Sequence, residues 1–249
     1  MSKIFDALRK AEQEPNPLAL GEERRVLEEG AQTPRNLRVF EREFGSLSSA
    51  IQSYCPKGKT GSAILVVGCV EREGATYVTT NLGRVLASTA GAPVLCLDGN
   101  FHDPAIARAF QATAGLGLAD VYDNGRARDV SDLLRAGDVS NLYFLSTGKR
   151  RIAPVAFFDS SEFEALLGSL RRTFRFIVID TAPLLKSPDA IHLASHVDGV
   201  VLVVRYKHLK REVIRKGIEM IESINAPVIG AVLNRRKFAI PTLIYKLIS

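Results

Sequence analysis

The stretch that decides the fold is Ala63-Ile-Leu-Val-Val-Gly-Cys-Val-Glu-Arg-Glu-Gly-Ala-Thr-Tyr-Val-Thr-Thr-Asn-Leu82. Its apolar start, from Ile64 to Val67, predicts a buried strand, and a polar loop and a helical pattern follow. This order brings backbone N–H groups and a helix N-terminus together, as in a phosphate-binding loop. That loop normally ends in Gly-Lys-[Ser/Thr], whereas this chain reads Gly74-Ala75-Thr76. The sequence therefore predicts a nucleotide site without the lysine that reaches the phosphates.

The composition is that of an ordinary globular protein. The chain has 249 residues, of which 46% are hydrophobic and 24% charged, enough for one α/β domain with an extension. Its net charge of +6 admits nucleic acid, an anionic membrane surface or an acidic partner. The basic residues are spread out and no nucleic-acid-binding motif is present, so we expect no nucleic-acid partner.

Cysteine usage and hydropathy favour a cytoplasmic protein. The three cysteines, Cys55, Cys69 and Cys96, are odd in number, and two of them lie at predicted buried strand positions. This pattern fits reduced thiols rather than disulfides or a metal site. No signal peptide is recognisable, and the apolar runs fall far short of the ~20 residues that a membrane span requires.

The first part of the chain is expected to lie outside the main domain. Residues 1–12 predict an amphipathic docking helix, in which Ile4, Phe5 and Leu8 share one face. Residues 13–36 have the proline-containing, charged composition of a linker. Two interpretations stay open, because the helix can pack on its own domain or dock on a partner or an anionic membrane surface. Residues 37–249 are expected to form the main domain.

Apolar strands alternate with helices through the rest of the chain. We expect strands at 64–67, 93–98, 141–145, 176–180, 199–204 and 227–233, and helices at 37–52, from 76 onward, at 160–174, 188–196 and 209–224, with short helical pieces within 104–137. Strands that are apolar throughout predict an α/β fold with a doubly wound, mostly parallel sheet and helices on both faces. Such a P-loop NTPase-like fold binds its ligands beyond the carboxyl ends of the strands.

Polar residues end three of the predicted strands and should meet at that rim. Asp98 and Asp180 each follow a strongly apolar run, and Asn234 follows the last strand. Beside a phosphate loop, such carboxylates usually hold Mg²⁺ directly or through water, and Thr76 would add a hydroxyl ligand. Each aspartate could instead cap a following turn. Two aspartates together with the loop favour a metal–nucleotide site.

Several runs of the chain resemble motifs of the bacterial tyrosine kinases. Glu73–Gly83 is similar to that family's phosphate loop, Val94–Pro104 to its second acidic motif, and Phe174–Pro183 to its Walker B motif. Asp198–Arg205 and Pro227–Arg235 match its last two strands. The resemblance covers nearly the whole chain in order, and it implies the family's P-loop NTPase-like fold.

The resemblance also implies a role in exopolysaccharide or capsule biosynthesis. ATP and Mg²⁺ are the implied cofactors, and Asp98 and Asp180 are the implied catalytic residues if the chain is active. The implied partner is the cytoplasmic tail of a membrane polysaccharide co-polymerase, which the N-terminal helix and the basic run Arg235-Arg236-Lys237 are expected to meet; a homo-oligomer stays open. The chain is then expected in the cytoplasm, peripheral at the inner face of the plasma membrane.

The chain departs from the family pattern at the residues that carry the chemistry. Ala75 replaces the loop lysine, and Arg72 replaces a glycine at a position suited to positive φ. Asn100 stands where the family has its expected catalytic base, and an amide cannot accept a proton as a carboxylate does. His102 replaces the arginine of the same motif. We therefore expect a degenerate nucleotide site formed by Arg72, Gly74, Ala75, Thr76 and Asn234.

The family's features for self-assembly are altered as well. Its ring-assembly motif, Glu-x-x-Arg-x-x-Arg, reads Arg42, Gly45 and Ser48 at the corresponding positions. Its C-terminal tyrosine cluster is reduced to Tyr245. The chain thus departs from the family in the phosphate-binding lysine, the proton acceptor, the assembly motif and the tyrosine-rich tail. It keeps the strands.

These departures leave two main hypotheses. The first is a pseudokinase that acts as a regulatory or binding component of exopolysaccharide biosynthesis, with weak or no ATP binding. The second is an active ATP-dependent protein-tyrosine kinase or ATPase that takes a cation from elsewhere, although Arg72 itself is expected to crowd the phosphates. A MinD/ParA-type positioning ATPase is disfavoured, because Val70 stands where that group carries an extra lysine.

Overall fold

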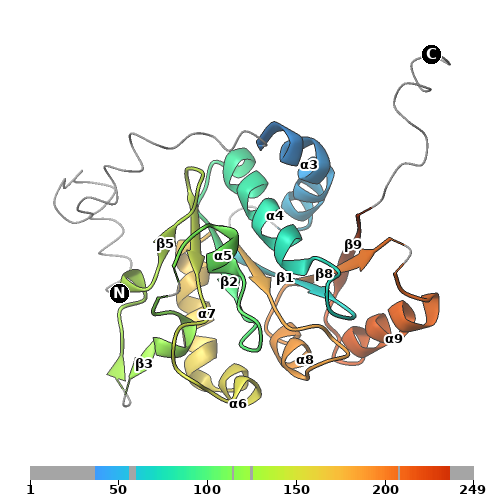
Figure 1. Cartoon of the computed structure of the whole chain (residues 1–249). Helices are drawn as coiled ribbons and strands as arrows, with labels where there is room; N and C mark the ends of the chain where they lie inside the picture. Colours follow the sequence, from blue (N-terminus) through green and yellow to red (C-terminus); the bar gives the residue numbers. More distant parts are fainter. Residues whose placement is uncertain (1–36, 56–59, 114, 124–125, 207, 236–249) are drawn as a thin grey trace.

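The computed structural model describes residues 37–55, 60–113, 115–123, 126–206 and 208–235 (Figure 1). The predicted docking helix of residues 1–12, the linker of residues 13–36 and Tyr245 lie outside the described residues. The basic run after Arg235 lies outside them too. None of the helices within the described ranges is long and apolar enough to cross a membrane.

The predicted mostly parallel sheet is confirmed. It has seven strands in the order β5-β6-β2-β7-β1-β8-β9, and all neighbours pair in parallel except β5 and β6. The strands are β1 (Ser62–Gly68), β2 (Val94–Asp98), β5 (Arg135–Ala136), β6 (Leu142–Leu145), β7 (Phe176–Asp180), β8 (Gly199–Arg205) and β9 (Val228–Asn234). Every residue of β1, β2 and β7 is buried, which explains why these runs are apolar throughout.

Helices cover both faces of the sheet, as predicted (Figure 1). One face packs against α3 (Leu37–Tyr54), α4 (Ala75–Ala90) and α5 (Ile106–Ala109). The other face packs against α6 (Pro154–Phe158), α7 (Ser161–Thr173), α8 (Asp189–Ala194) and α9 (Arg211–Glu222). Because successive strand residues alternate in direction, Ile64 and Val66 join the first core and Leu65 and Val67 the second.

Four short elements, three strands and one helix, correct the sequence prediction. Residues 104–137, expected to hold only helical pieces, contain the antiparallel pair β3 (Tyr122–Asp123) and β4 (Arg126–Ala127) and the edge strand β5, besides α5 and the 3₁₀ turns Leu118–Asp120 and Val130–Asp132. The helix α6 was also missed. Each of these strands has two residues and α6 has five, so none is long enough to show a hydrophobic period.

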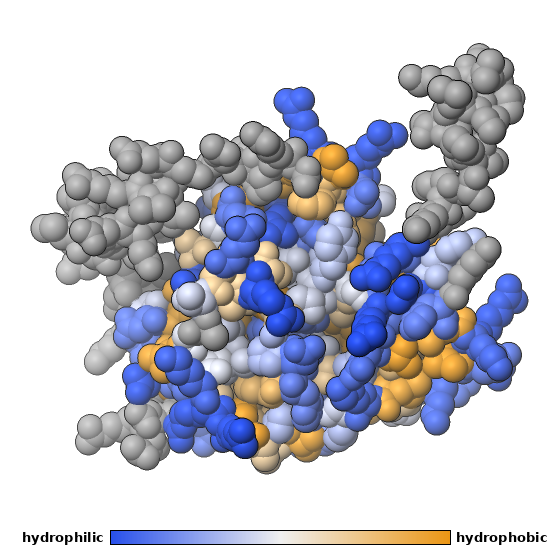
Figure 2. All heavy atoms as spheres, viewed as in Figure 1, coloured by the Kyte–Doolittle hydropathy of each residue, from blue (hydrophilic) through white to orange (hydrophobic). Residues whose placement is uncertain are grey.

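Helix α9 presents a mixed surface. Its Ile214 and Ile218 lie in a shallow apolar depression that Arg211, Arg215 and glutamates border, and Figure 2 shows apolar side chains gathered there between hydrophilic ones. The buried core behind α9 includes Ile221.

The cysteines agree with the prediction of reduced thiols. Cys55, Cys69 and Cys96 are all free and buried. Burial raises the pKa of the Cys69 thiol to about 11 and that of Cys96 to about 12. A neutral, buried thiol is a poor nucleophile and a poor metal ligand, so these cysteines serve packing.

Candidate nucleotide-binding site

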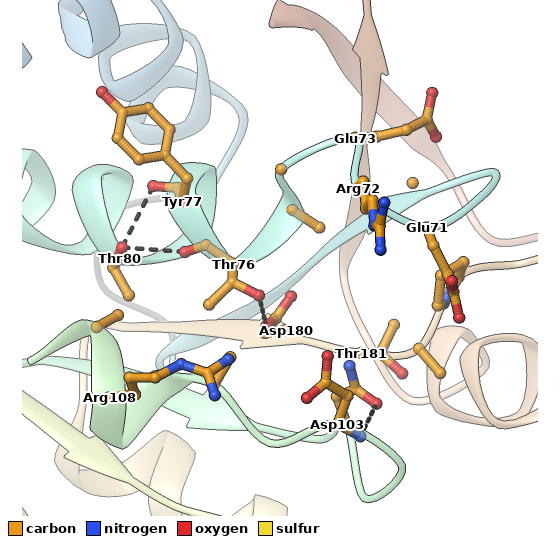
Figure 3. A pocket seen from close by; sticks show the side chains of 18 of the residues that line it. Glu71, Arg72, Glu73, Thr76, Tyr77, Thr80, Asp103, Arg108, Asp180 and Thr181 are labelled. Carbon is orange, nitrogen blue, oxygen red and sulfur yellow. Dashed lines mark hydrogen bonds between the residues drawn. The ribbon is translucent and has the colours of Figure 1, made fainter. Parts of the chain in front are cut away.

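The predicted rim of polar residues forms at the carboxyl ends of the strands. In the parallel pairing of β2 with β7, Asp98 lies directly opposite Asp180. The loop after β1 and Asn234 at the end of β9 reach the same region. The loop after β1 and Asp180 line a cavity of about 780 Å³, seen from close by in Figure 3, whereas Asp98 and Asn234 are not among its lining residues. Residues that are more than a hundred positions apart in the sequence thus meet because the sheet is parallel.

Gly74 fixes the shape of the loop where α4 begins. It has φ 94° and ψ 31°, and a Cβ at this position would lie 2.2 Å from Nδ2 of Asn234. That Nδ2 donates a 2.7 Å hydrogen bond to the carbonyl of Glu73. Only glycine fits both the left-handed backbone and the close approach of Asn234. The helix starts without a side-chain cap, so the N–H groups of its first turn stay available to an anion.

Glu73 supports the loop from behind, a role that the sequence analysis missed. Its buried carboxylate accepts hydrogen bonds from the N–H groups of Cys69 at 2.6 Å, Val70 at 3.1 Å and Arg205 at 3.3 Å. In Figure 3 its side chain points away from the cavity. The Glu73 carboxylate therefore stabilises the curved form of the loop, because it bonds both to N–H groups within the loop and to the N–H of Arg205 in β8.

Exposed, positively charged side chains lie on another side of the cavity, here called the cation side. Arg72 has φ 64°, which confirms the prediction that its position requires a left-handed backbone. Its side chain lines the cavity, as do those of Arg108 and Lys186. Lys186 pairs with Glu71 and lowers the pKa of that carboxyl. Ala75, in the place of the loop lysine, brings no charge to this side.

The predicted metal ligands Thr76 and Asp180 lie together on one side of the cavity, here called the metal side, and Asp180 is buried. Thr76 Oγ1 donates a 2.5 Å hydrogen bond to Asp180 Oδ2, whereas the buried Asp180 Oδ1 has no partner within the described part of the chain. Burial, helped by the nearby Asp98, raises the pKa of Asp180 to about 8. A hydroxyl and a carboxylate with an unpaired oxygen are the donors that Mg²⁺ prefers, so these residues fit the ion. Mg²⁺ would replace the proton on Asp180.

Asp98 caps the turn that follows its strand, which was the alternative to a role as a metal ligand. Its Oδ2 accepts hydrogen bonds from the N–H groups of Ala105 and Ile106, both at 2.9 Å, and its Oδ1 accepts one from Asn100 at 3.2 Å. Burial nevertheless raises its pKa to about 6. Asp98 thus shapes the turn into α5 and adds negative charge beside Asp180. Its direct contact with Mg²⁺ stays a prediction.

Two other departures from the family pattern are used in local structure. The amide oxygen of Asn100 accepts a 3.1 Å hydrogen bond from the N–H of Asp103 and so closes a turn. Ser48, in the altered assembly motif, is buried and lies 3.2 Å from the Thr89 hydroxyl of α4. Arg42, by contrast, is exposed on α3, and Gly45 is partly buried.

Sequence comparison finds tyrosine kinases among the relatives of this chain. The tyrosine-protein kinase CpsD of Streptococcus agalactiae is 27% identical over 208 residues, which cover 84% of this chain and 89% of the relative. CpsD of Streptococcus pneumoniae is 25% identical over 199 residues, which cover 80% of this chain and 86% of the relative. No protein-family model matches the chain.

Solved structures extend the similarity to the whole fold. The kinase domain of VpsO is 26% identical and superposes with a TM-score of 0.71, over 81% of this chain and 97% of that one. The chimerical protein CapA2B2 is 24% identical and superposes with a TM-score of 0.71, over 86% of this chain and 90% of that one. The cell division ATPase MinD of Pyrococcus furiosus is 23% identical and superposes with a TM-score of 0.59, over 76% of this chain and 79% of that one. The chain is thus a homologue of the bacterial tyrosine kinases, built on the P-loop NTPase fold of MinD-type ATPases.

Proposed function

We propose that this chain is a degenerate homologue of the bacterial tyrosine kinases that serves exopolysaccharide or capsule biosynthesis as a regulatory or binding component. The observation that carries the proposal is Ala75 at the first position of α4, beside the hydrogen-bonded pair of Thr76 and Asp180. The site keeps its loop, Thr76 and Asp180, but lacks the amine that would reach the phosphates. The biosynthetic system is inferred from the resemblance of the sequence motifs to the kinase family.

The loss of the lysine affects catalysis more than binding. A charge-assisted contact to phosphate contributes about 1.5–3 kcal/mol, or roughly ten- to hundredfold in affinity. The free N–H groups of α4 and a bound Mg²⁺ would leave weak ATP binding. Phosphoryl transfer depends mainly on positioned positive charge, and Ala75 removes such a charge. ATP, when bound, would supply the phosphoryl group, while Thr76 and Asp180 would hold its Mg²⁺.

A second candidate function is an active protein-tyrosine kinase or ATPase. It is favoured by the exposed cations at the cavity, namely Arg72, Arg108 and Lys186. Lys186 and its partner Glu71 are about half exposed, at 50% and 58% of their side-chain area, so their ion pair is weak and can be exchanged for a phosphate. A partner protein that repositions one of these side chains would restore the missing charge.

The partner and the location are proposals from the resemblance. We expect binding to the cytoplasmic tail of a membrane polysaccharide co-polymerase, and a peripheral position at the inner face of the plasma membrane. A pull-down with such a tail and with anionic liposomes, by the full chain and by a chain without residues 1–12, tests the docking helix. Equal capture of both chains would assign the contact to the main domain instead.

A phosphotyrosine assay separates the two candidate functions. The purified chain is incubated with ATP and Mg²⁺ and analysed by mass spectrometry, alone and with a tyrosine-containing acceptor. We expect no phosphotyrosine above the level of an Asp180→Asn control. Phosphotyrosine that forms in the wild type and disappears in Asp180→Asn would overturn the pseudokinase proposal.

A further inference from the structure

A second polar cluster lies on the rim of the same cavity. Nε2 of His102 lies 2.8 Å from Oδ2 of Asp189 and 3.3 Å from the hydroxyl of Ser187. The Asp189 side chain is 3% exposed, whereas that of His102 is 46% exposed and lines the cavity. The cluster joins the loop after β2 to the start of α8. A half-exposed imidazole is therefore anchored by a buried carboxylate.

The anchor determines which imidazole nitrogen is free. A carboxylate accepts hydrogen bonds, so the neutral imidazole places its single proton on Nε2, next to Asp189. Nδ1 then carries a lone pair, and it has no hydrogen-bond partner among the residues that the structure describes. A base whose second nitrogen is oriented by a carboxylate is the arrangement that general-base catalysis uses.

We propose that His102, positioned by Asp189, supplies the proton acceptor that is missing at Asn100. The inference rests on the proposed function, because it takes the rim as a nucleotide site. Nδ1 would take the proton of an acceptor hydroxyl while its oxygen bonds to the terminal phosphorus. The bond from that phosphorus to the bridging oxygen breaks, and the leaving ADP keeps the electron pair. It follows that Ala75, not the loss of a base, limits turnover.

Several charged groups surround this imidazole and have to be considered in any pH measurement. Among the ionisable side chains that the structure describes, Asp189 is the one that forms a hydrogen bond with it. The other ionisable residues that line the cavity come from the loop after β1, α4, the loop after β2 with α5, the loop before β6, and β7 with the loop after it. They are Glu71, Arg72, Glu73, Tyr77, Arg84, Asp103, Arg108, Asp138, Asp180 and Lys186. Since these groups include both signs, the ionisation of His102 has to be measured directly on its ring nitrogens.

The first test reads the tautomer of the wild-type chain without any turnover. Long-range proton–nitrogen NMR spectra of ¹⁵N-histidine-labelled protein show which ring nitrogen is protonated, and a His102→Asn sample assigns the signal. We expect the Nε2–H tautomer for His102 and a shift of its Nδ1 signal when Mg²⁺ and ADP are added. A protonated Nδ1 in the neutral ring, or no response to ADP at concentrations that calorimetry shows to bind, would overturn the inference.

The second test uses a chain whose cation is restored. Phosphate release from ATP is compared between Ala75→Lys and Ala75→Lys/His102→Asn, and we expect a loss of about a hundredfold, in the range of general-base effects. The rate of Ala75→Lys should rise with pH through the His102 ionisation measured by NMR in the same variant. The matched control is Ala75→Lys/His192→Asn, because His192 forms a similar 2.8 Å pair with Asp159 away from the cavity.

The outcomes separate this inference from the proposed function. If Ala75→Lys binds Mg²⁺ and ATP but releases phosphate at a rate that His102→Asn leaves unchanged, or releases none, His102 is not the proton acceptor. If the wild type already forms phosphotyrosine, the pseudokinase proposal fails, and the effect of His102→Asn on that activity decides the inference. If Ala75→Lys does not bind ATP, the tautomer of His102 decides it.

Discussion

The metal side and the cation side of the cavity differ in how firmly the fold holds them. Asp180 is buried at the end of a central strand and bonds to Thr76 on α4. Arg72 and Lys186 are exposed and take part in no core packing. A lysine at position 75 could therefore be lost without unfolding the chain, whereas a change at Gly74 alters the scaffold and a change at Asp180 alters the charge buried in it. Chemistry carried by exposed side chains is lost more easily than chemistry carried by strand ends.

The largest effect is expected from Gly74→Ala. The new Cβ would meet Nδ2 of Asn234 at 2.2 Å and would hold alanine at φ 94°, so we expect a loss of about 2–4 kcal/mol in unfolding free energy. Urea unfolding measures it. Gly91→Ala is the matched control, since Gly91 also has positive φ, at 60°, but has open space around it. Equal losses in the two variants would show that Asn234 does not hold the loop.

The next largest effect is the pH dependence of stability that Asp180 causes. The folded chain keeps this carboxyl protonated up to about pH 8, whereas the unfolded chain loses the proton near pH 3.8. Since the folded state binds more protons in this interval, wild-type stability should fall as pH rises from about 4 to about 8 in Mg²⁺-free buffer. Asp180→Asn removes this loss, and we expect it to exceed the wild type by about 1 kcal/mol or more at pH 8.

Two comparisons check the origin of that difference. The exposed Asp132→Asn variant should follow the wild-type pH profile. Added Mg²⁺ should stabilise the wild type at pH 8 but not Asp180→Asn. A flat wild-type profile, or an equal response of both proteins to Mg²⁺, would show that the metal side is not assembled as described.

A smaller loss is expected when the support behind the loop is weakened. Glu73→Gln replaces a carboxylate that accepts three N–H groups with an amide that has one acceptor oxygen, so we expect about 1–2 kcal/mol less stability. Glu71→Gln, on the exposed side of the same loop, is the control and should leave the urea midpoint unchanged. If both changes are silent, the loop does not depend on the Glu73 carboxylate.

The smallest effect is expected from Lys186→Ala. Its ion pair with Glu71 is exposed, and such pairs add little to stability, so the urea midpoint should not move measurably. The ATP affinity measured by calorimetric titration with Mg²⁺ should also be unchanged, because Lys186 pairs with Glu71 and we expect it to have no role at the phosphates. A clear loss of ATP affinity would identify Lys186 as the substitute cation and would favour the active-kinase candidate.

The sequence predicts the main strands and the rim because long apolar runs and strand-ending aspartates are local signals. Asp98 and Asp180 meet as expected once the sheet is parallel, whereas Asn234 reaches the loop at Glu73 and not the two aspartates. The pairing of His102 with Asp189 could not be predicted, because it joins side chains 87 positions apart across two loops. The sequence gives only a weak signal for the role of Glu73, namely an acidic residue directly before the loop glycine. Which way its side chain points is determined only by the folded loop.

We propose that the missing cation, and not a damaged scaffold, weakens nucleotide binding. The most direct measurement is calorimetric titration with ATP and Mg²⁺ of the wild type, Ala75→Lys and Ala75→Lys/Arg72→Gly. We predict weak or no binding by the wild type and at least about tenfold tighter binding by the variants, the value of one charge-assisted phosphate contact. A wild type that binds as tightly as the variants would contradict the claim and would show that another cation has replaced the lysine.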